Sequence, residues 1–131
     1  MARILVIDDD EVFVDVMVHA LEERGHAVTF ALDGLAGTRA FTAQPFDAVI
    51  CDLVMPNQEG LETIRHMRRE RPCIAIVAVS GGLPRAPQID VLNLASKFGA
   101  DQTLRKPFKP SQLGTAVDAA LAARGEAPMQ G

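Results

Sequence analysis

The 131-residue chain has no tryptophan, no tyrosine and only two cysteines, Cys51 and Cys73. Both cysteines lie within apolar runs, and they lack the C-x-x-C spacing of redox and zinc motifs. Two cysteines in this arrangement are too few for a disulfide framework or a zinc site. We therefore expect two reduced thiols in the hydrophobic core of a cytoplasmic protein.

Long apolar runs are missing as well. No stretch of 18 residues is uninterrupted by polar side chains, so we expect no membrane-spanning helix. The first apolar run ends at Asp8 after four residues, which is too short for a signal peptide. Positively charged residues are fewer than negatively charged ones, since the chain has 13 Lys and Arg and 17 Asp and Glu. A net negative chain is poorly suited to nucleic acid or to an anionic membrane, and we expect neither as a partner.

Short apolar runs predict a buried β-sheet. The runs at 4–7, 48–51 and 74–79 are rich in β-branched residues and lack polar alternation, which is typical of strands covered on both faces. The more polar segments 27–31 and 102–105 suit the edges of such a sheet. Helical patterns follow each strand, at 11–24, 34–43, 60–70, 89–98 and 110–124.

This alternation of strand and helix predicts an α/β fold with a doubly wound, five-stranded parallel sheet. The length suits one domain, which we place over residues 1–124, with a flexible tail at 125–131. In such sheets, ligands bind beyond the carboxyl ends of the strands. The residues that follow the predicted strands are therefore the first candidates for a functional site.

Charged and hydroxyl residues occupy those positions. Four acidic residues, Asp8 to Glu11, follow the first strand, and Asp52 follows the third, Ser80 the fourth and Lys106 the fifth. Neighbouring carboxylates repel one another unless a cation neutralises them, and oxygen ligands alone favour Mg²⁺. A metal beside a lysine and a hydroxyl suits phosphoryl transfer, in which an aspartate oxygen attacks phosphorus and forms an acyl phosphate. Taken singly, each aspartate could instead cap a helix, and we expect Asp10 to do so.

In four motifs the chain resembles the response-regulator receiver domains of two-component signalling. These motifs are Ile4–Asp10, Asp52–Pro56, Val79–Gly81 and Lys106–Phe108. The resemblance covers about residues 2–124 and implies a flavodoxin-like (βα)5 fold with strand order 2-1-3-4-5. It also implies that Asp52 accepts a phosphoryl group from a phosphohistidine. The donor would be a sensor histidine kinase or a histidine phosphotransfer protein.

The same resemblance implies a set of metal ligands. Asp9 and Asp52 would bind Mg²⁺ directly, and Asp8 would act largely through water. The backbone carbonyl of Val54 would be a further ligand. Lys106 would pair with the phosphoryl oxygens, and no turnover of an external substrate is expected.

The resemblance further implies a switch region at Ser80 and Gly81, where a hydroxyl and an amide would bind phosphoryl oxygens. Many receivers carry Tyr or Phe three residues before the lysine, and that ring moves inward on activation. Here Thr103 occupies the position. We therefore expect the output change to run mainly through loop 81–88 and helix 89–98.

The first helix predicts a docking face. With Val12 at zero and about 100° per residue, five apolar residues span roughly 40° to 180° and should face the sheet. They are Val16, Ala20, Phe13, Met17 and Leu21. Val14 and Val18 fall at roughly 200° and 240°, beyond that stripe. We expect these two valines to be exposed and to dock the phosphodonor.

Two function classes remain in competition. The first is a single-domain regulator that signals by phosphorylation-dependent protein interaction or by relaying the phosphoryl group, since only seven residues follow position 124. The alternative is a phosphatase of the haloacid-dehalogenase type, with Asp8 as nucleophile and Asp10 as acid/base, because residues 8–12 fit D-x-D-x-[TV]. That alternative leaves Asp52–Pro56 without a role. A flavodoxin is disfavoured, because carboxylates follow the first strand where a phosphate cradle needs donors.

Overall fold

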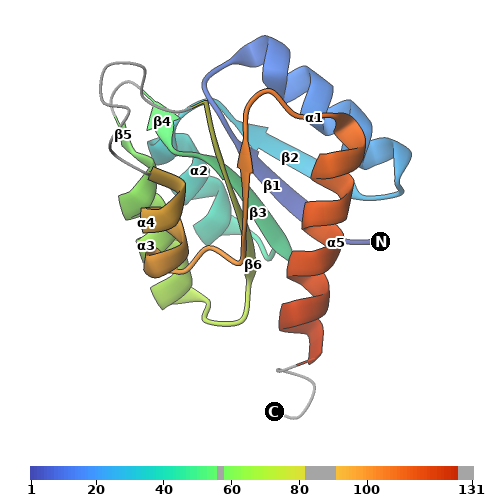
Figure 1. Cartoon of the computed structure of the whole chain (residues 1–131). Coiled ribbons are helices and arrows are strands. Elements are labelled where there is room, and N and C mark those ends of the chain that lie inside the picture. Colours follow the sequence, from blue (N-terminus) through green and yellow to red (C-terminus); the bar gives the residue numbers. More distant parts are fainter. Residues whose placement is uncertain (56–57, 82–90, 127–131) are drawn as a thin grey trace.

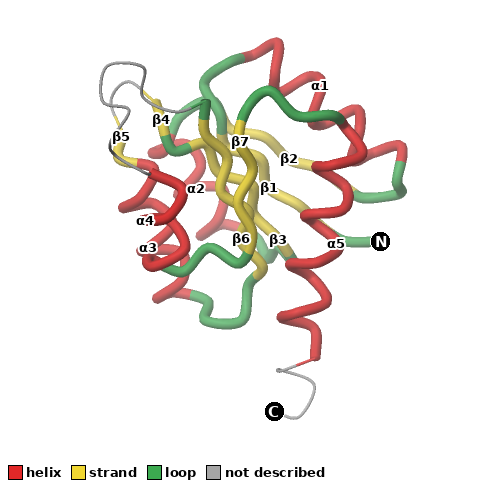
Figure 2. Tube along the Cα trace, viewed as in Figure 1, coloured by secondary structure: helices red, strands yellow, loops and turns green. Residues whose placement is uncertain are grey.

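Five parallel strands form the central sheet of the computed structural model, which describes residues 1–55, 58–81 and 91–126 (Figures 1 and 2). They are β1 (Arg3–Ile7), β2 (Ala27–Ala31), β3 (Ala48–Asp52), β6 (Ala75–Ser80) and β7 (Gln102–Arg105). Their spatial order is β2-β1-β3-β6-β7, with every neighbouring pair parallel. The predicted flavodoxin-like α/β fold and its strand order 2-1-3-4-5 are confirmed.

Helices cover both faces of this sheet (Figure 1). They are α1 (Glu11–Glu23), α2 (Gly34–Ala43), α3 (Gly60–Glu70), α4 (Val91–Phe98) and α5 (Pro110–Glu126). Helices α1 and α5 lie on one face, and α2, α3 and α4 lie on the other. A short antiparallel pair, β4 (Val54–Met55) and β5 (Gln58–Glu59), stands apart from the main sheet, and the sequence pattern did not predict it.

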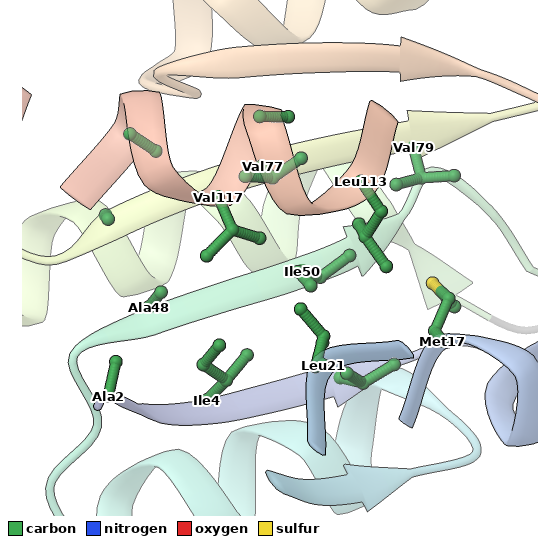
Figure 3. Close-up of a cluster of buried hydrophobic side chains, with 14 of the residues drawn as sticks. Ala2, Ile4, Met17, Leu21, Ala48, Ile50, Val77, Val79, Leu113 and Val117 are labelled. Atoms are coloured by element: carbon green, nitrogen blue, oxygen red, sulfur yellow. The ribbon is translucent and has the colours of Figure 1, made fainter. Parts of the chain in front are cut away.

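Two hydrophobic layers explain why the central strands carry no polar alternation. In β3, Val49 and Cys51 face the layer under α2, α3 and α4, whereas Ile50 faces the layer under α1 and α5. Figure 3 shows the second layer, in which Leu21 of α1 and Val117 of α5 converge on Ile50. Because both faces of the strand are buried, every position must be apolar until the strand reaches its carboxyl end.

Helix boundaries follow local capping chemistry. The Asp10 carboxylate accepts a hydrogen bond from the Phe13 amide at 3.1 Å, so the predicted N-cap of α1 is confirmed. Asp33 caps α2 in the same way, through the amide of Ala36 at 2.7 Å. Helix α5 begins at Pro110 as expected but runs to Glu126, two residues into the segment predicted as a tail.

The exposure predicted for α1 is wrong. Val14 is buried, at 1% exposure, and Val18 is partly buried against the layer shared by α1 and α5. Val12 and Val16 are exposed instead, at 74% and 47%. The inward stripe is rotated from the predicted one because α1 packs against α5 as well as against the sheet.

The prediction that both thiols are buried is wrong for one of them. Cys51 is buried in β3 as expected, but Cys73 is exposed, because it lies in the turn between α3 and β6 and not in the strand. Within the described segments, no helix combines the length and apolar character needed to cross a bilayer. Most of loop 81–88, the first two residues of predicted helix 89–98 and positions 127–131 lie outside the described residues.

Candidate functional site

Three carboxylates meet where β1 and β3 end. The two strands are neighbours, and their register pairs Ile7 with Cys51, so Asp8 and Asp52 follow side by side at the carboxyl edge of the sheet. Asp9 is the next residue after Asp8. One oxygen from each of Asp8, Asp9 and Asp52 lies within 4.8 Å of the other two. Asp8 and Asp52 are buried, at 1% and 3% exposure, whereas Asp9 is open to solvent.

The next two strands bring a hydroxyl and an ammonium to the same edge. Ser80 ends β6 and is buried, and it pairs in register with Arg105 of β7. The Lys106 amide donates to the Ser80 carbonyl at 2.8 Å, which continues the ladder by one residue. The Lys106 Nζ atom then lies 2.9 Å from an Asp8 oxygen and 3.8 Å from an Asp52 oxygen.

Burial of the Asp8 carboxylate is balanced by specific partners. One oxygen accepts from Lys106 at 2.9 Å, and the other accepts from the Asp10 amide at 3.0 Å. A buried carboxylate is tolerated only when it is paired and hydrogen-bonded. Among the ion pairs of the described residues, one ammonium, that of Lys106, lies beside the carboxylates of Asp8 and Asp52, and Asp9 adds a third carboxylate. The cluster therefore keeps a net negative charge and favours binding of a further cation.

The donor set fits a hard divalent metal. Carboxylate oxygens at these separations suit Mg²⁺, and a metal there would neutralise the mutual repulsion of Asp8, Asp9 and Asp52. Cys51 is no candidate ligand, because burial, followed by the nearby Asp52 and Asp8 charges, raises its pKa and keeps it a thiol. Val54 opens β4 two residues after Asp52, and its carbonyl as a ligand stays a prediction.

Gly60, at the start of α3, fixes the backbone around Asp52. A Cβ atom at this position would lie 2.6 Å from the Asp52 carbonyl oxygen and 2.6 Å from the Leu53 Cα atom. Only glycine allows the helix to approach the end of β3 this closely. No such part was predicted for Gly60, although a glycine at the first position of the predicted helix 60–70 is a signal that could have suggested it.

Two aromatic side chains near Lys106 were also missed as part of the site. The Lys106 Nζ atom lies 4.3 Å from the centroid of the Phe13 ring. Phe13 in turn meets Phe108 edge-to-face, with centroids 5.1 Å apart and an interplanar angle of 81°. Sequence reasoning had counted Phe13 among the sheet-facing residues of α1, and the structure shows that it also borders the ammonium.

The residues predicted to form the switch region lie at different distances from the carboxyl edge of the sheet. Gly81 directly follows β6, and a Cβ atom there would sit 3.9 Å from the Lys106 Cβ atom. Thr103 lies further back, in β7, where it pairs in register with Ala78. It lines a hollow of about 300 Å³ between β7 and α5. Their part in signal output stays a prediction.

Comparison with known proteins identifies this arrangement. The sequence model of the response regulator receiver domain matches residues 4–118. The chain belongs to this family. A receiver domain is a phosphoacceptor and not a turnover enzyme, and its partners are histidine kinases.

Curated relatives of this receiver domain are longer proteins. A probable transcriptional regulatory protein of Picosynechococcus is 37% identical in an alignment of 119 positions that covers 86% of this chain and 46% of the relative. CseB of Streptomyces avermitilis, a transcriptional regulatory protein, is 35% identical over 125 residues, 95% of this chain and 51% of CseB. The chain thus spans about half the length of these relatives.

Solved receiver structures share the fold. The response regulator protein TrrA of Thermotoga maritima, in complex with Mg²⁺ and BeF, is 27% identical, with a TM-score of 0.78 and coverage of 92% of this chain and 99% of TrrA. The haloacid-dehalogenase alternative is set aside, since the receiver family accounts for nearly the whole chain. Asp10, its supposed acid/base, caps α1 instead.

Proposed function

We propose that this receiver domain accepts a phosphoryl group on Asp52 from a phosphohistidine donor, with Mg²⁺ bound by the carboxylate cluster. The observation that carries the proposal is the position of Lys106, whose Nζ atom lies 2.9 Å from Asp8 and 3.8 Å from Asp52. The Lys106 ammonium beside three carboxylates suits a site that must bind both a divalent cation and an incoming phosphoryl group.

The transfer step is a substitution at phosphorus. An Asp52 carboxylate oxygen attacks phosphorus in line, a P–O bond forms and the P–N bond to the donor imidazole breaks. The electron pair of the P–N bond stays on the donor nitrogen, and a proton on that ring makes the leaving group neutral imidazole. Hydrolysis reverses the modification when water attacks the same phosphorus and releases inorganic phosphate.

Each side chain around Asp52 contributes a separate interaction. The Lys106 ammonium neutralises charge that develops on a phosphoryl oxygen, and the Ser80 hydroxyl donates a hydrogen bond to another. The exposed backbone at Gly81 leaves room for its amide to do the same. Asp8, Asp9 and the Val54 carbonyl hold the metal together with Asp52.

When bound, Mg²⁺ supplies positive charge that offsets the negative charge of the phosphoryl oxygens. Its assignment is supported by the oxygen-only cluster of Asp8, Asp9 and Asp52. It is also supported by the Thermotoga maritima relative, whose structure contains Mg²⁺ with BeF. Phosphorylation then changes the surface that a target protein contacts, or the phosphoryl group passes on in a relay.

The test is mass spectrometry of the chain after incubation with acetyl phosphate and Mg²⁺. We expect the wild type to gain the mass of one phosphoryl group and peptide mapping to place it on Asp52. Asp52→Asn should gain none, because an amide is not a nucleophile towards phosphorus. Asp15→Asn, which removes an exposed carboxylate of α1 outside the cluster, is the matched control and should be modified normally.

Two results would contradict the proposal. A phosphoryl group on Asp8 would restore the haloacid-dehalogenase alternative. Modification of Asp52 at the same rate after chelation of Mg²⁺ with EDTA would remove the role assigned to the carboxylate cluster.

A further inference from the structure

Phe13 borders the ammonium of Lys106 on the side of α1. Its ring is partly buried against the layer under α1 and α5, and the Lys106 Nζ atom lies 4.3 Å from the ring centroid. Phe108, two residues after Lys106, presents itself edge-to-face to the same ring at 5.1 Å. The ring of Phe13 thus has one aromatic neighbour and one cationic neighbour, both from the segment that follows β7.

This geometry is attractive on electrostatic grounds. The face of an aromatic ring carries partial negative charge, and an ammonium within about 6 Å of the centroid is drawn to it. The attraction is stronger where water is partly excluded, and the Lys106 side chain is only 19% exposed. The perpendicular contact with Phe108 favours one orientation of the Phe13 ring.

A lysine needs such a restraint. Its four-carbon stem has many rotamers, and ordering them costs free energy that an active site must supply before the reaction. Asp8 holds the Lys106 ammonium from one direction at 2.9 Å. Phe13 holds it from another, without contributing a formal charge that would repel a phosphoryl group.

We propose that Phe13 is a positioning residue that keeps the Lys106 ammonium where the phosphoryl oxygens on Asp52 arrive. This inference rests on the proposed function, since it concerns the rate of phosphorylation of Asp52. A purely structural role, in which Phe13 only fills space beside the core, makes different predictions. Leucine would satisfy that role, whereas positioning requires an aromatic face.

The kinetic test compares Phe13→Leu with Phe13→Tyr, using acetyl phosphate as donor at saturating Mg²⁺. We expect Phe13→Leu to lower the rate of Asp52 phosphorylation about three- to tenfold, the range that one partly desolvated cation–π contact supports. Phe13→Tyr, which retains the aromatic face, should keep most of the wild-type rate. In a Lys106→Met background, Phe13→Leu should cause no further loss, because the group to be positioned is gone.

A spectroscopic test on the unphosphorylated chain addresses the contact itself. In the wild type and in Phe13→Tyr, the ring current should shift the Lys106 ε-methylene proton resonances upfield. In Phe13→Leu that shift should disappear while the remaining amide spectrum stays dispersed, which also shows that the variant folds.

The outcomes separate the two proposals. If the wild type is not modified on Asp52, the proposed function fails and the role of Phe13 fails with it. If the wild type is modified and Phe13→Leu matches its rate, the positioning role alone is overturned. A loss of rate in Phe13→Leu that persists unchanged in the Lys106→Met background, or that Phe13→Tyr shares, would also overturn positioning.

Discussion

The Arg68 guanidinium and the Asp101 carboxylate form an ion pair of 2.9 Å at the amino-terminal edge of the sheet, opposite the carboxylate cluster. Their side chains are 16% and 10% exposed. Arg68 also donates to the carbonyls of Gly99 and Ile74, and Asp101 accepts from the amide of Ile76 at 2.9 Å. Burial lowers the pKa of Arg68, and the Asp101 charge opposes that shift.

Loss of Arg68 should destabilise the protein substantially. Arg68→Ala removes the donor from the carbonyls of Gly99, Pro72 and Ile74 and leaves Asp101 with Arg124 as its remaining guanidinium partner, which we expect to lower the free energy of unfolding by about 2–4 kcal/mol. Urea denaturation followed by far-UV circular dichroism measures the change. Arg69→Ala, on the exposed side of the same helix, is the control and should cost less than about 0.5 kcal/mol. Equal losses of stability in Arg68→Ala and Arg69→Ala would show that the ion pair of Arg68 with Asp101 does not stabilise the fold.

Gly60→Ala should damage both stability and metal binding. The added Cβ atom would lie 2.6 Å from the Asp52 carbonyl, so α3 or the end of β3 must move, and we expect a loss of about 1–3 kcal/mol. Mg²⁺ affinity, measured by calorimetric titration, should fall as Asp52 shifts. In Gly81→Ala the new atom meets Lys106 only at 3.9 Å, an ordinary contact, so its stability should be close to that of the wild type. The reverse ranking would refute this account of Gly60.

The two thiols should differ sharply in reactivity. Burial raises the pKa of Cys51, so this group stays protonated and shielded in the folded protein, whereas Cys73 is exposed. Ellman's reagent at pH 8 should therefore titrate one thiol in the native protein and two in guanidinium chloride. Cys73→Ser should abolish the native reaction, and a rapid reaction that survives this substitution would show that Cys51 is accessible.

His26 should make stability depend on pH. Burial, followed by the charge of the chain's amino terminus, lowers the His26 pKa from 6.5; Arg24 acts in the same direction, and Asp118 opposes them. The unfolded chain therefore binds this proton more tightly than the folded protein does. The His26 contribution is complete above about pH 6.5 and is lost as pH falls through the lower folded pKa.

Thermal unfolding of the wild type and His26→Gln between pH 5 and pH 8 tests that sign. Between pH 8 and pH 5, the melting temperature of the wild type should fall further than that of His26→Gln. A wild type that is relatively more stable at pH 5 would contradict the direction of the shift.

The exposed valines of α1, Val12 and Val16, replace Val14 and Val18 as candidates for contact with the phosphodonor. They lie within two turns of the helix start that Asp10 caps, beside the carboxylate cluster. Val12→Ser together with Val16→Ser should slow transfer from the cognate kinase about fivefold or more and leave transfer from acetyl phosphate unchanged. Leu35→Ser, an exposed apolar residue of α2, is the matched control. Equal slowing with both donors would point to damage of the site itself.

The sheet was predictable from the sequence, and so was the edge of the sheet at which the candidate site residues lie, because both depend on where the strands end. Uninterrupted apolar runs marked β1, β3 and β6, and the first polar residue after each run marked the edge where ligands bind. Asp8, Asp52 and Ser80 could thus be placed together from the sequence. The short pair β4 and β5 was not predicted, because strands of two residues are too short to show a hydrophobic periodicity.

Helix orientation was harder to predict. The apolar residues of α1 cover an almost continuous arc of roughly 240°, so hydrophobicity alone does not say which end of the arc meets water. Contact with α5 buries the side of Val14 and leaves Val12 exposed. Side-chain pairs such as Lys106 with Phe13 lie beyond sequence patterns altogether, because they join residues 93 positions apart.

The register of Ile7 with Cys51 has a consequence for how substitutions act on the site. Asp8 and Asp52 are brought together by the β1–β3 ladder, because each is the residue after a paired strand position. Asp9 adds its carboxylate from the segment that leads into α1. Substitutions on the surrounding surface can therefore change which proteins this receiver contacts without changing the strand pairing that holds Asp8 beside Asp52.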